Sequence, residues 1–242
     1  MKLPDFSYEI EATRKGYKVI AGMDEVGRGS FAGPVVTGCV VMEIGVLPLG
    51  SPKAFPPANK LGAPSLGPPA SRHPLVTIND SKRISPKQRE IADGWIRKNA
   101  VSFGIGKASV AEINRVGIKK ATEMAFRRAI INCDKKIDYL LIDAFYIPYI
   151  RGLRRKNQKP IIKGDSLSIS IAAASIIAKV YRDGLMTKLS NKPKYKKYKW
   201  DQNKGYGTLS HRNTIKKYGS TKLHRKKFVE TYLNNFSSSQ VR

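Results

Sequence analysis

Apolar residues fall into short runs along the first two thirds of the chain, and the lengths of these runs predict strands that alternate with helices. Segments 16–25 (GYKVIAGMDE) and 34–44 (PVVTGCVVMEI) each contain an apolar run of strand length. The dipeptide Gly33-Pro34 between them is a turn signal. We therefore predict two antiparallel strands joined by a tight turn.

Three further runs predict strands at 101–109 (VSFGIGKAS), 137–145 (IDYLLIDAF) and 159–165 (KPIIKGD). The run at 137–145 is nearly continuous, which is typical of a strand buried on both faces. Because helical segments separate the later strands, we predict that these strands run parallel.

A helix is predicted to begin at residue 85, because Ser85-Pro86-Lys87-Gln88 has the form of a capping box with proline at the first helical position. Helical patterns are also predicted at 110–116, 118–133, 166–189, 210–218 and 222–235. The segment 166–189 is rich in small residues, so we expect it to pack tightly in the middle of the fold. Strands and helices in mixed order predict an α/β domain.

Residues 45–75 interrupt this pattern, because they hold 8 of the chain's 14 prolines and no acidic residue. Proline removes the N–H donor that helices and central strands need. We expect a mobile surface insertion here. Recognition of the proline-rich segment by a partner domain is the alternative.

The charge balance points to a polyanionic partner. The chain has 45 Lys and Arg against 18 Asp and Glu, a formal net charge of +27, and such an excess attracts nucleic acid. An anionic membrane surface is the alternative, but no apolar run approaches the ~20 residues that a span needs. The N-terminus lacks a secretory signal, and the two cysteines lie far apart in sequence, which disfavours a disulfide framework or a zinc site. We expect a cytoplasmic protein without membrane contacts.

Segment 188–227 is strongly basic, with 14 Lys and Arg, one acid and a net charge of +13. It also contains large aromatic residues: Tyr195, Tyr198, Trp200, Tyr206 and Tyr218. Basic residues interleaved with aromatics suit phosphate contacts combined with stacking, whereas a merely solvated surface would not need so one-sided a balance. We expect His211 and His224, in the same segment, to face solvent or phosphate.

Acidic residues stand at the ends of three predicted strands: Asp24 with Glu25, Asp143, and Asp165. Functional groups of α/β folds gather at the carboxyl ends of strands. Four crowded carboxylates would repel one another, and a divalent cation with a preference for oxygen ligands, Mg²⁺ or Mn²⁺, removes that conflict. Neighbouring strand residues point to opposite faces, so Asp24 and Glu25 can share a site only if the strand ends or bulges at Glu25.

Each acid also has a purely structural interpretation. Asp143 could cap the end of a strand, and Asp165, followed by Ser166, could cap the next helix. Asp24 and Glu25 could belong to a solvated turn. Asp183 is not at a strand end, and we expect it on the exposed face of a helix.

Six segments in order resemble the type 2 ribonucleases H, the ribonuclease HII family. The first is DEVGRGSFAGPVV at 24–36, and the next are DSKRIS, FGIGKASVAEINRVGI, YLLIDAF, KGDSLSISIAAASIIAKVYRD, and KGYGT leading to LHRKKF. The resemblance runs from about residue 17 to 230 and is interrupted only by the proline-rich insertion. Asn114 departs from the family pattern, which more usually has an acid there.

The resemblance implies an RNase H-like mixed sheet flanked by helices, and a four-carboxylate site of Asp24, Glu25, Asp143 and Asp165. In the family these acids hold Mn²⁺ or Mg²⁺, two ions during catalysis, and the RNA strand of an RNA–DNA hybrid is hydrolysed to a 3′-hydroxyl and a 5′-phosphate. Asp24 is expected to bridge both ions and Asp165 to bind one. Single ribonucleotides embedded in duplex DNA are also expected substrates.

The resemblance also assigns substrate contacts. Gly27-Arg28-Gly29 would read the 2′-hydroxyl next to the scissile phosphate, because glycines let the backbone approach the ribose. Tyr206 would stack on the sugar at the RNA–DNA junction, and Ser81 with Lys82 would contact phosphate. A structural turn, a half-buried core tyrosine and a solvated lysine are the respective alternatives.

We expect two regions, an RNase H-like catalytic domain at 1–205 and a basic C-terminal helical substrate-binding region at 206–242, in a monomer. Two other functions compete with this interpretation. The related ribonuclease HIII usually carries an additional N-terminal domain, and only about 16 residues precede the first predicted strand. A non-catalytic RNA-binding protein would explain the charge but not the four acids.

Overall fold

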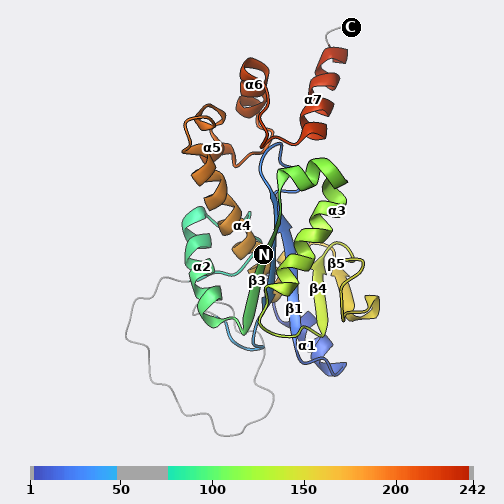
Figure 1. Ribbon diagram of the computed structural model, residues 1–242. Coiled ribbons are helices and arrows are strands. Elements are labelled where there is room, and N and C mark those ends of the chain that lie inside the picture. The colour runs from blue at the N-terminus through green and yellow to red at the C-terminus, as the bar shows by residue number, and fades with distance from the viewer. Residues whose placement is uncertain (1–2, 48–75, 240–242) are drawn as a thin grey trace, which may run out of the picture.

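The computed structural model of the protein describes residues 3–47 and 76–239, and it has one mixed sheet at its centre (Figure 1). The predicted insertion at 45–75 lies outside these ranges except for residues 45–47. The strands are β1 (Ile20–Val26), β2 (Val35–Val41), β3 (Ser102–Ala108), β4 (Tyr139–Asp143) and β5 (Gln158–Ile161), in the order β3-β2-β1-β4-β5. The expected α/β architecture is therefore confirmed.

The strand directions agree with the prediction except at β3. β1 and β2 are antiparallel, while β1 with β4 and β4 with β5 are parallel. β3 was predicted to be parallel, but it pairs with β2 in antiparallel register, with Val41 opposite Ser102. The chain thus returns to the sheet at the same end at which it left, so the helix between the two strands makes no crossover.

Helices cover both faces of the sheet. α4 (Ile169–Ser190) lies on β1 and β2 with α2 (Pro86–Asn99) beside it, and α3 (Val110–Ile131) packs against β3 and β2 on the opposite face. α3 is kinked at Gly117, the residue that separates the two predicted helical segments. Ser85 accepts a hydrogen bond from the Gln88 N–H and the Gln88 side chain accepts one from the Ser85 N–H, which confirms the predicted capping box.

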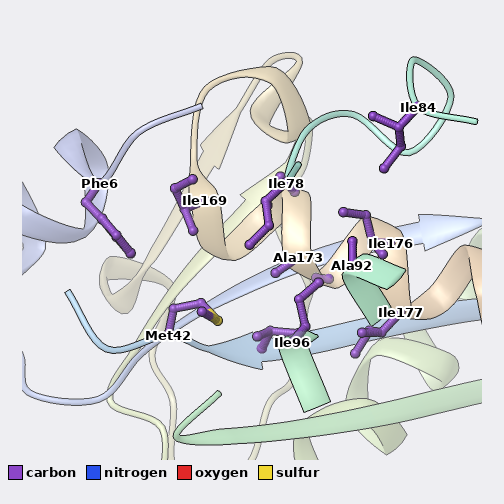
Figure 2. Packing of buried hydrophobic residues seen from close by; sticks show 13 residues of the cluster. Phe6, Met42, Ile78, Ile84, Ala92, Ile96, Ile169, Ala173, Ile176 and Ile177 are labelled. Carbon is purple, nitrogen blue, oxygen red and sulfur yellow. The ribbon is translucent and has the colours of Figure 1, made fainter. Parts of the chain in front are cut away.

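The largest core cluster lies between α4, α2 and the sheet. Figure 2 shows Ile96 of α2 close to Ile177 of α4, with Met42 from the end of β2 and Phe6 at the far side. Phe6 directly precedes α1 (Ser7–Arg14), so this short helix is joined to the same core. Burial of these side chains is the main stabilisation of this face.

α4 approaches the sheet so closely because two strand residues that face it are glycines. A Cβ on Gly22 of β1 would lie 2.0 Å from the Ser170 carbonyl carbon, and one on Gly38 of β2 would lie 2.2 Å from the Ala174 oxygen. The small residues of α4 complement them, as expected from the sequence. This close packing brings α4 directly beside the end of β1 that carries Asp24.

The basic C-terminal part of the chain lies beyond one end of the sheet (Figure 1). It contains α5 (Trp200–Asn203), α6 (Leu209–Tyr218) and α7 (Lys226–Ser239), and short 3-10 turns occur at Arg155–Asn157, Gly164–Ser166 and Lys196–Tyr198. Its core joins residues of both predicted regions: Ala32, Met186, Tyr195, Tyr198, Trp200, Ile215 and Val229. No helix within the described ranges is long and apolar enough to cross a membrane.

Candidate active site

Asp24 and Glu25 lie near the carboxyl end of β1, two and one residues before its last residue. The expected strand end or bulge at Glu25 is wrong, because the ladder continues with Glu25 opposite Thr37 and Val26 opposite Val36. The two side chains leave the strand on opposite faces. Both nevertheless line one cavity of about 400 Å³, since the strand ends directly after them and the chain turns at Gly27.

The same cavity collects most of the predicted site residues. Its other lining residues include Gly27, Arg28, Gly29, Ser81, Lys82 and Tyr206, which come from segments far apart in the sequence. Asp143 and Asp165 are not among its lining residues, but both charges act on Asp24. The structure therefore brings the predicted residues together: most of them line this cavity, and Asp143 and Asp165 lie close enough to Asp24 for their charges to act on it.

Asp143 ends β4, the neighbour of β1, as predicted. Asp165 does not end a strand, because β5 stops at Ile161 and the backbone turns through a left-handed residue, Lys163, into a 3-10 turn. The Gly164 N–H donates to the Asp143 carboxylate at 2.8 Å, which ties this turn to the end of β4. Asp165 is thereby held beside Asp143. The alternative that Asp165 caps α4 is wrong, since Ser168 is the cap.

Burial and neighbouring carboxylates raise the pKa values of Asp24, Glu25 and Asp165. Burial, followed by the charge of Glu25, raises the pKa of Asp24 well above its ordinary value, and Asp143 and Asp165 add to this. Burial also raises the pKa of Glu25 to about 7, although the Arg28 guanidinium acts in the opposite direction. The pKa of Asp165 is raised by burial and by the charges of Asp80 and Asp143. The site therefore disfavours negative charge and would be stabilised by a cation.

Two serines connect Asp24 to the rest of the site. The Ser175 side chain of α4 hydrogen-bonds Asp24, and its Oγ lies 2.9 Å from the Ser81 Oγ, where either hydroxyl can be the donor. Ser175 was not predicted, because in sequence it is one small residue among many in AAASIIA. The close packing of α4 on the sheet gives it this position.

Lys82 brings positive charge to the acids. Burial lowers its pKa, but the charges of Asp24, Asp80 and Asp165 together raise it above the ordinary value for lysine. Asp80 is a fifth acid at the site, which the sequence analysis did not single out although it directly precedes Ser81 and Lys82. Its carboxylate accepts a hydrogen bond from the Lys82 N–H at 2.9 Å, which fixes the turn that presents the lysine.

Tyr206 is partly exposed at the cavity and lies over two cations. The Lys179 Nζ is 5.7 Å and the Arg182 Cζ 5.3 Å from its ring centroid. Arg182 is fully buried beneath the Gly27–Gly29 loop, which we call the glycine loop, and donates to the carbonyls of Ala32 and Pro34. Arg182 was not predicted, because nothing in the sequence distinguishes it from the other charged residues of its helix.

Three expectations for the helical and basic segments are wrong. Asp183 is half-buried and pairs with Lys179 at 2.9 Å rather than standing free in solvent. His211 and His224 are buried, not exposed to solvent or phosphate. Most of the aromatic residues in the basic segment are also core residues. They alternate with exposed lysines because one side of this segment packs inward while the other faces solvent. The buried ones are Tyr195, Tyr198 and Trp200.

The donor chemistry of the site suits a divalent cation. Within residues 3–47 and 76–239, no three His, Cys, Asp or Glu side chains are close enough together to hold one ion between them. The acids are nevertheless hard oxygen donors, and the buried Glu25 Oε2 has no hydrogen-bond partner. A buried carboxylate oxygen without a partner is costly unless a ligand satisfies it. The residues therefore fit a hard divalent cation.

Comparison with known proteins agrees with this geometry. The family model described as Ribonuclease HII matches residues 71–231. The Ribonuclease HII of Wolbachia pipientis subsp. Culex pipiens (strain wPip) is 42% identical over 230 residues, which is 95% of this chain and 98% of that protein.

Solved structures share the fold at low sequence identity. The ribonuclease H2 from Pyrococcus horikoshii OT3 has a TM-score of 0.58 at 20% identity and covers 89% of this chain and 99% of its own. Bst-RNase HIII, solved in complex with Mn²⁺, has a TM-score of 0.61 at 15% identity and covers 92% of this chain and 71% of its own. The expected RNase H-like fold is thus confirmed. The family match and the sequence identity to curated relatives show that the chain belongs to the ribonuclease HII family and is a ribonuclease H, a hydrolase.

Proposed function

We propose that the protein is an endonuclease that hydrolyses the RNA strand of RNA–DNA hybrids and cuts at single ribonucleotides embedded in duplex DNA. The observation that carries this proposal is the shared cavity, in which Asp24 and Glu25 adjoin the Gly27–Gly29 loop and Tyr206. The acids would serve hydrolysis, and the loop beside them, whose backbone can approach a ribose, would serve sugar recognition. The two tasks would therefore be combined in one place.

Asp24, Glu25, Asp143 and Asp165 are the residues that would hold divalent cations, Mn²⁺ or Mg²⁺. When bound, such ions activate water and stabilise the leaving 3′-oxygen, so that the products carry a 3′-hydroxyl and a 5′-phosphate. Asp24 is hydrogen-bonded to Ser175 and is influenced by the charges of the other three acids, so it would hold a cation jointly with them. The Mn²⁺ in the related Bst-RNase HIII supports this choice of cation.

Gly27, Arg28 and Gly29 would read the 2′-hydroxyl, which both donates and accepts hydrogen bonds and so distinguishes RNA from DNA. A Cβ built on Gly29 meets no atom within 4 Å, which leaves its backbone open to a substrate. Tyr206 would stack on the sugar at the RNA–DNA junction. Lys82, and Ser81 behind it, would contact the phosphate next to the acids.

The basic segment would contact the duplex backbone outside the cavity. Between residues 194 and 199 the lysines are exposed while Tyr195 and Tyr198 are buried, so the charge faces solvent and the aromatics anchor it. Phosphate contacts of this kind position a duplex but do not select its sugar. We define the four exposed lysines as Lys194, Lys196, Lys197 and Lys199.

The test is cleavage of a labelled RNA–DNA hybrid with Mn²⁺ or Mg²⁺ and with a chelator, comparing Asp24→Asn with Asp138→Asn. Asp138 directly precedes β4, at the end of the strand away from Asp143, and it accepts hydrogen bonds from the N–H groups of Lys18 and Val19. We expect no cleavage in chelator or by Asp24→Asn, and near-normal cleavage by the control. Undiminished cleavage by Asp24→Asn would contradict the assignment of the acids, and cleavage in chelator would contradict the role of the metal.

A further inference from the structure

Four ionisable side chains that the sequence analysis did not assign to the site are buried behind the cavity. Arg182, Arg225 and His211 have no exposed surface, and His224 is 2% exposed. Burying such groups costs free energy unless their hydrogen bonds are satisfied. Two of them bond directly to the elements proposed to read the substrate: Arg225 donates to carbonyls of the Gly27–Gly29 loop, and His211 contacts the Tyr206 carbonyl.

Arg225 holds the glycine loop. Its Nη2 donates to the Gly27 oxygen and its Nη1 to the Arg28 oxygen, both at 2.7 Å, and the same guanidinium donates to the Gly33 oxygen. In a trans peptide the C=O and the following N–H point in opposite directions. With these two carbonyls bound to Arg225, the N–H groups of Arg28 and Gly29 point away from it. Arg225 thus sets which polar groups the loop offers to a ribose.

His224 is connected to Tyr206 through His211, and the hydrogen bonds fix both tautomers. The Thr221 N–H donates to the His224 Nδ1 at 2.9 Å, so the His224 proton is on Nε2 and is donated to the His211 Nε2 at 3.2 Å. The His211 Nε2 also accepts from the Trp200 indole. The His211 proton is therefore on Nδ1, which donates to the Tyr206 carbonyl at 2.8 Å.

The two chains of contacts start from adjacent residues, His224 and Arg225, in a segment that is itself held firmly. The Arg225 N–H donates to the Phe31 oxygen at 2.8 Å, and the Lys226 N–H donates to the Asn114 side chain of α3 at 2.9 Å. Asn114 is the residue that departs from the family pattern, and here it anchors this segment.

We infer that Thr221–Arg225, which we call the brace, positions the ribose-reading loop and Tyr206 relative to each other and so contributes to the selection of single ribonucleotides. This inference rests on the proposed function. His211, His224 and Arg225 are positioning residues, because they contact the reading elements rather than the substrate. A brace that shifts would separate the two elements without altering the four acids.

The first test compares His211→Gln with His211→Asn. An asparagine amide reaches approximately the place of Nδ1 and keeps the donor to the Tyr206 carbonyl, whereas a glutamine amide reaches that of Nε2 and loses it. We expect His211→Gln to lower kcat/KM for a single-ribonucleotide duplex by about tenfold, the size of a coupling between contacting groups, with a much smaller loss on a long hybrid. His211→Asn should retain the ratio between the two substrates.

A double-mutant cycle separates positioning from folding. If His211 acts through Tyr206, His211→Gln should add no further loss of single-ribonucleotide selectivity in a Tyr206→Ala background. Ile215→Val, which trims a buried side chain of the same cluster without touching the hydrogen bonds, is the control for general destabilisation. Melting temperatures are measured for every variant.

His224→Asn and Arg225→Lys extend the test if His211→Gln does not fold. His224→Asn keeps an acceptor for the Thr221 N–H but loses the hydrogen bond to His211. Arg225→Lys keeps the positive charge but loses the several hydrogen bonds from the guanidinium to the Gly27–Gly29 loop. Equal losses on both substrates in the folded variants, or additive losses in the cycle, would overturn the brace. Absence of hybrid cleavage by the unmodified protein would instead overturn the proposed function.

Discussion

Gly27→Ala should destabilise the protein because this position accepts no side chain. The φ of Gly27 is +84°, and a Cβ there would lie 2.0 Å from the Arg182 Nε. Arg182 is fully buried and donates to the oxygens of Ser30, Ala32, Pro34 and Lys204, so it cannot move aside without breaking bonds. The substitution therefore combines backbone strain with the loss of buried hydrogen bonds.

The magnitude follows from these two terms. An alanine held at positive φ costs about 1–2 kcal/mol, and each hydrogen bond lost from a charged group costs about 1.5–3 kcal/mol. With one such bond lost, the free energy of unfolding should fall by about 3–5 kcal/mol. For a chain of this size each kcal/mol corresponds to about 2–4 °C, so the melting temperature should fall by roughly 6–20 °C.

Gly29→Ala is the matched control within the same loop. Its backbone is not at positive φ, and a Cβ there meets no atom within 4 Å, so the free energy of unfolding should change by no more than ~0.5 kcal/mol. Hybrid cleavage should still fall, because a methyl group would stand between the backbone and the ribose. Thermal unfolding and hybrid cleavage are measured for both variants. A Gly27→Ala protein that melts like the unmodified one would refute the reasoning about the loop.

Three further predictions concern stability and binding. Ser85→Ala should lower the free energy of unfolding by about 1 kcal/mol, measured in denaturant, because it removes the capping box of α2. Burial, with the His211 charge, lowers the pKa of His224 to about 4. As the pH falls, the unfolded chain therefore binds this proton before the folded protein does, and the free energy of unfolding should fall by about 3 kcal/mol between pH 6.5 and 4. Unfolding measured at several pH values should show a smaller loss for His224→Asn. Changing the four exposed lysines to glutamine should make hybrid affinity less dependent on salt: the slope of log affinity against log salt concentration should become shallower by about 0.9 for each phosphate that the variant no longer neutralises. The preference for ribose should not change. An unchanged slope would place the duplex on another face of the protein.

Local signals in the sequence were sufficient for most elements. The capping box at Ser85 places the start of α2 because its hydrogen bonds lie within four residues. The apolar run before Asp143 gives β4, because a strand buried on both faces needs such a run. The prediction that Asp24 and Glu25 share a site also agrees with the cavity, although the backbone reason given for it was wrong.

The errors arise where a distant contact decides the outcome. The direction of β3 depends on the end of the sheet to which the chain returns after α2, which no local pattern records. Asp165 was placed at a strand end because the apolar residues extend to Ile162, but the left-handed turn at Lys163 is held by Asp143 of another strand.

Buried polar residues were the hardest to predict. Arg182 and Arg225 look like ordinary surface residues in the sequence, because charged side chains are mostly exposed, and nothing distinguishes Ser175 from the other small residues of its helix. Their burial depends on acceptors supplied by the glycine loop and by β1, far away along the chain. His211 and His224 were misplaced because only the folded chain brings the two rings together with the Trp200 indole.

The central claim is that one cavity joins the acids to a reader of the ribose 2′-hydroxyl, and one measurement tests it most directly. Three labelled DNA duplexes, identical except for one sugar that is ribose, 2′-O-methylribose or deoxyribose, are incubated with the protein and Mn²⁺. The account predicts a single cut at the ribose duplex, with 3′-hydroxyl and 5′-phosphate ends, and intact methylated and deoxyribose duplexes. Cleavage of the deoxyribose or methylated duplex at a comparable rate would contradict it.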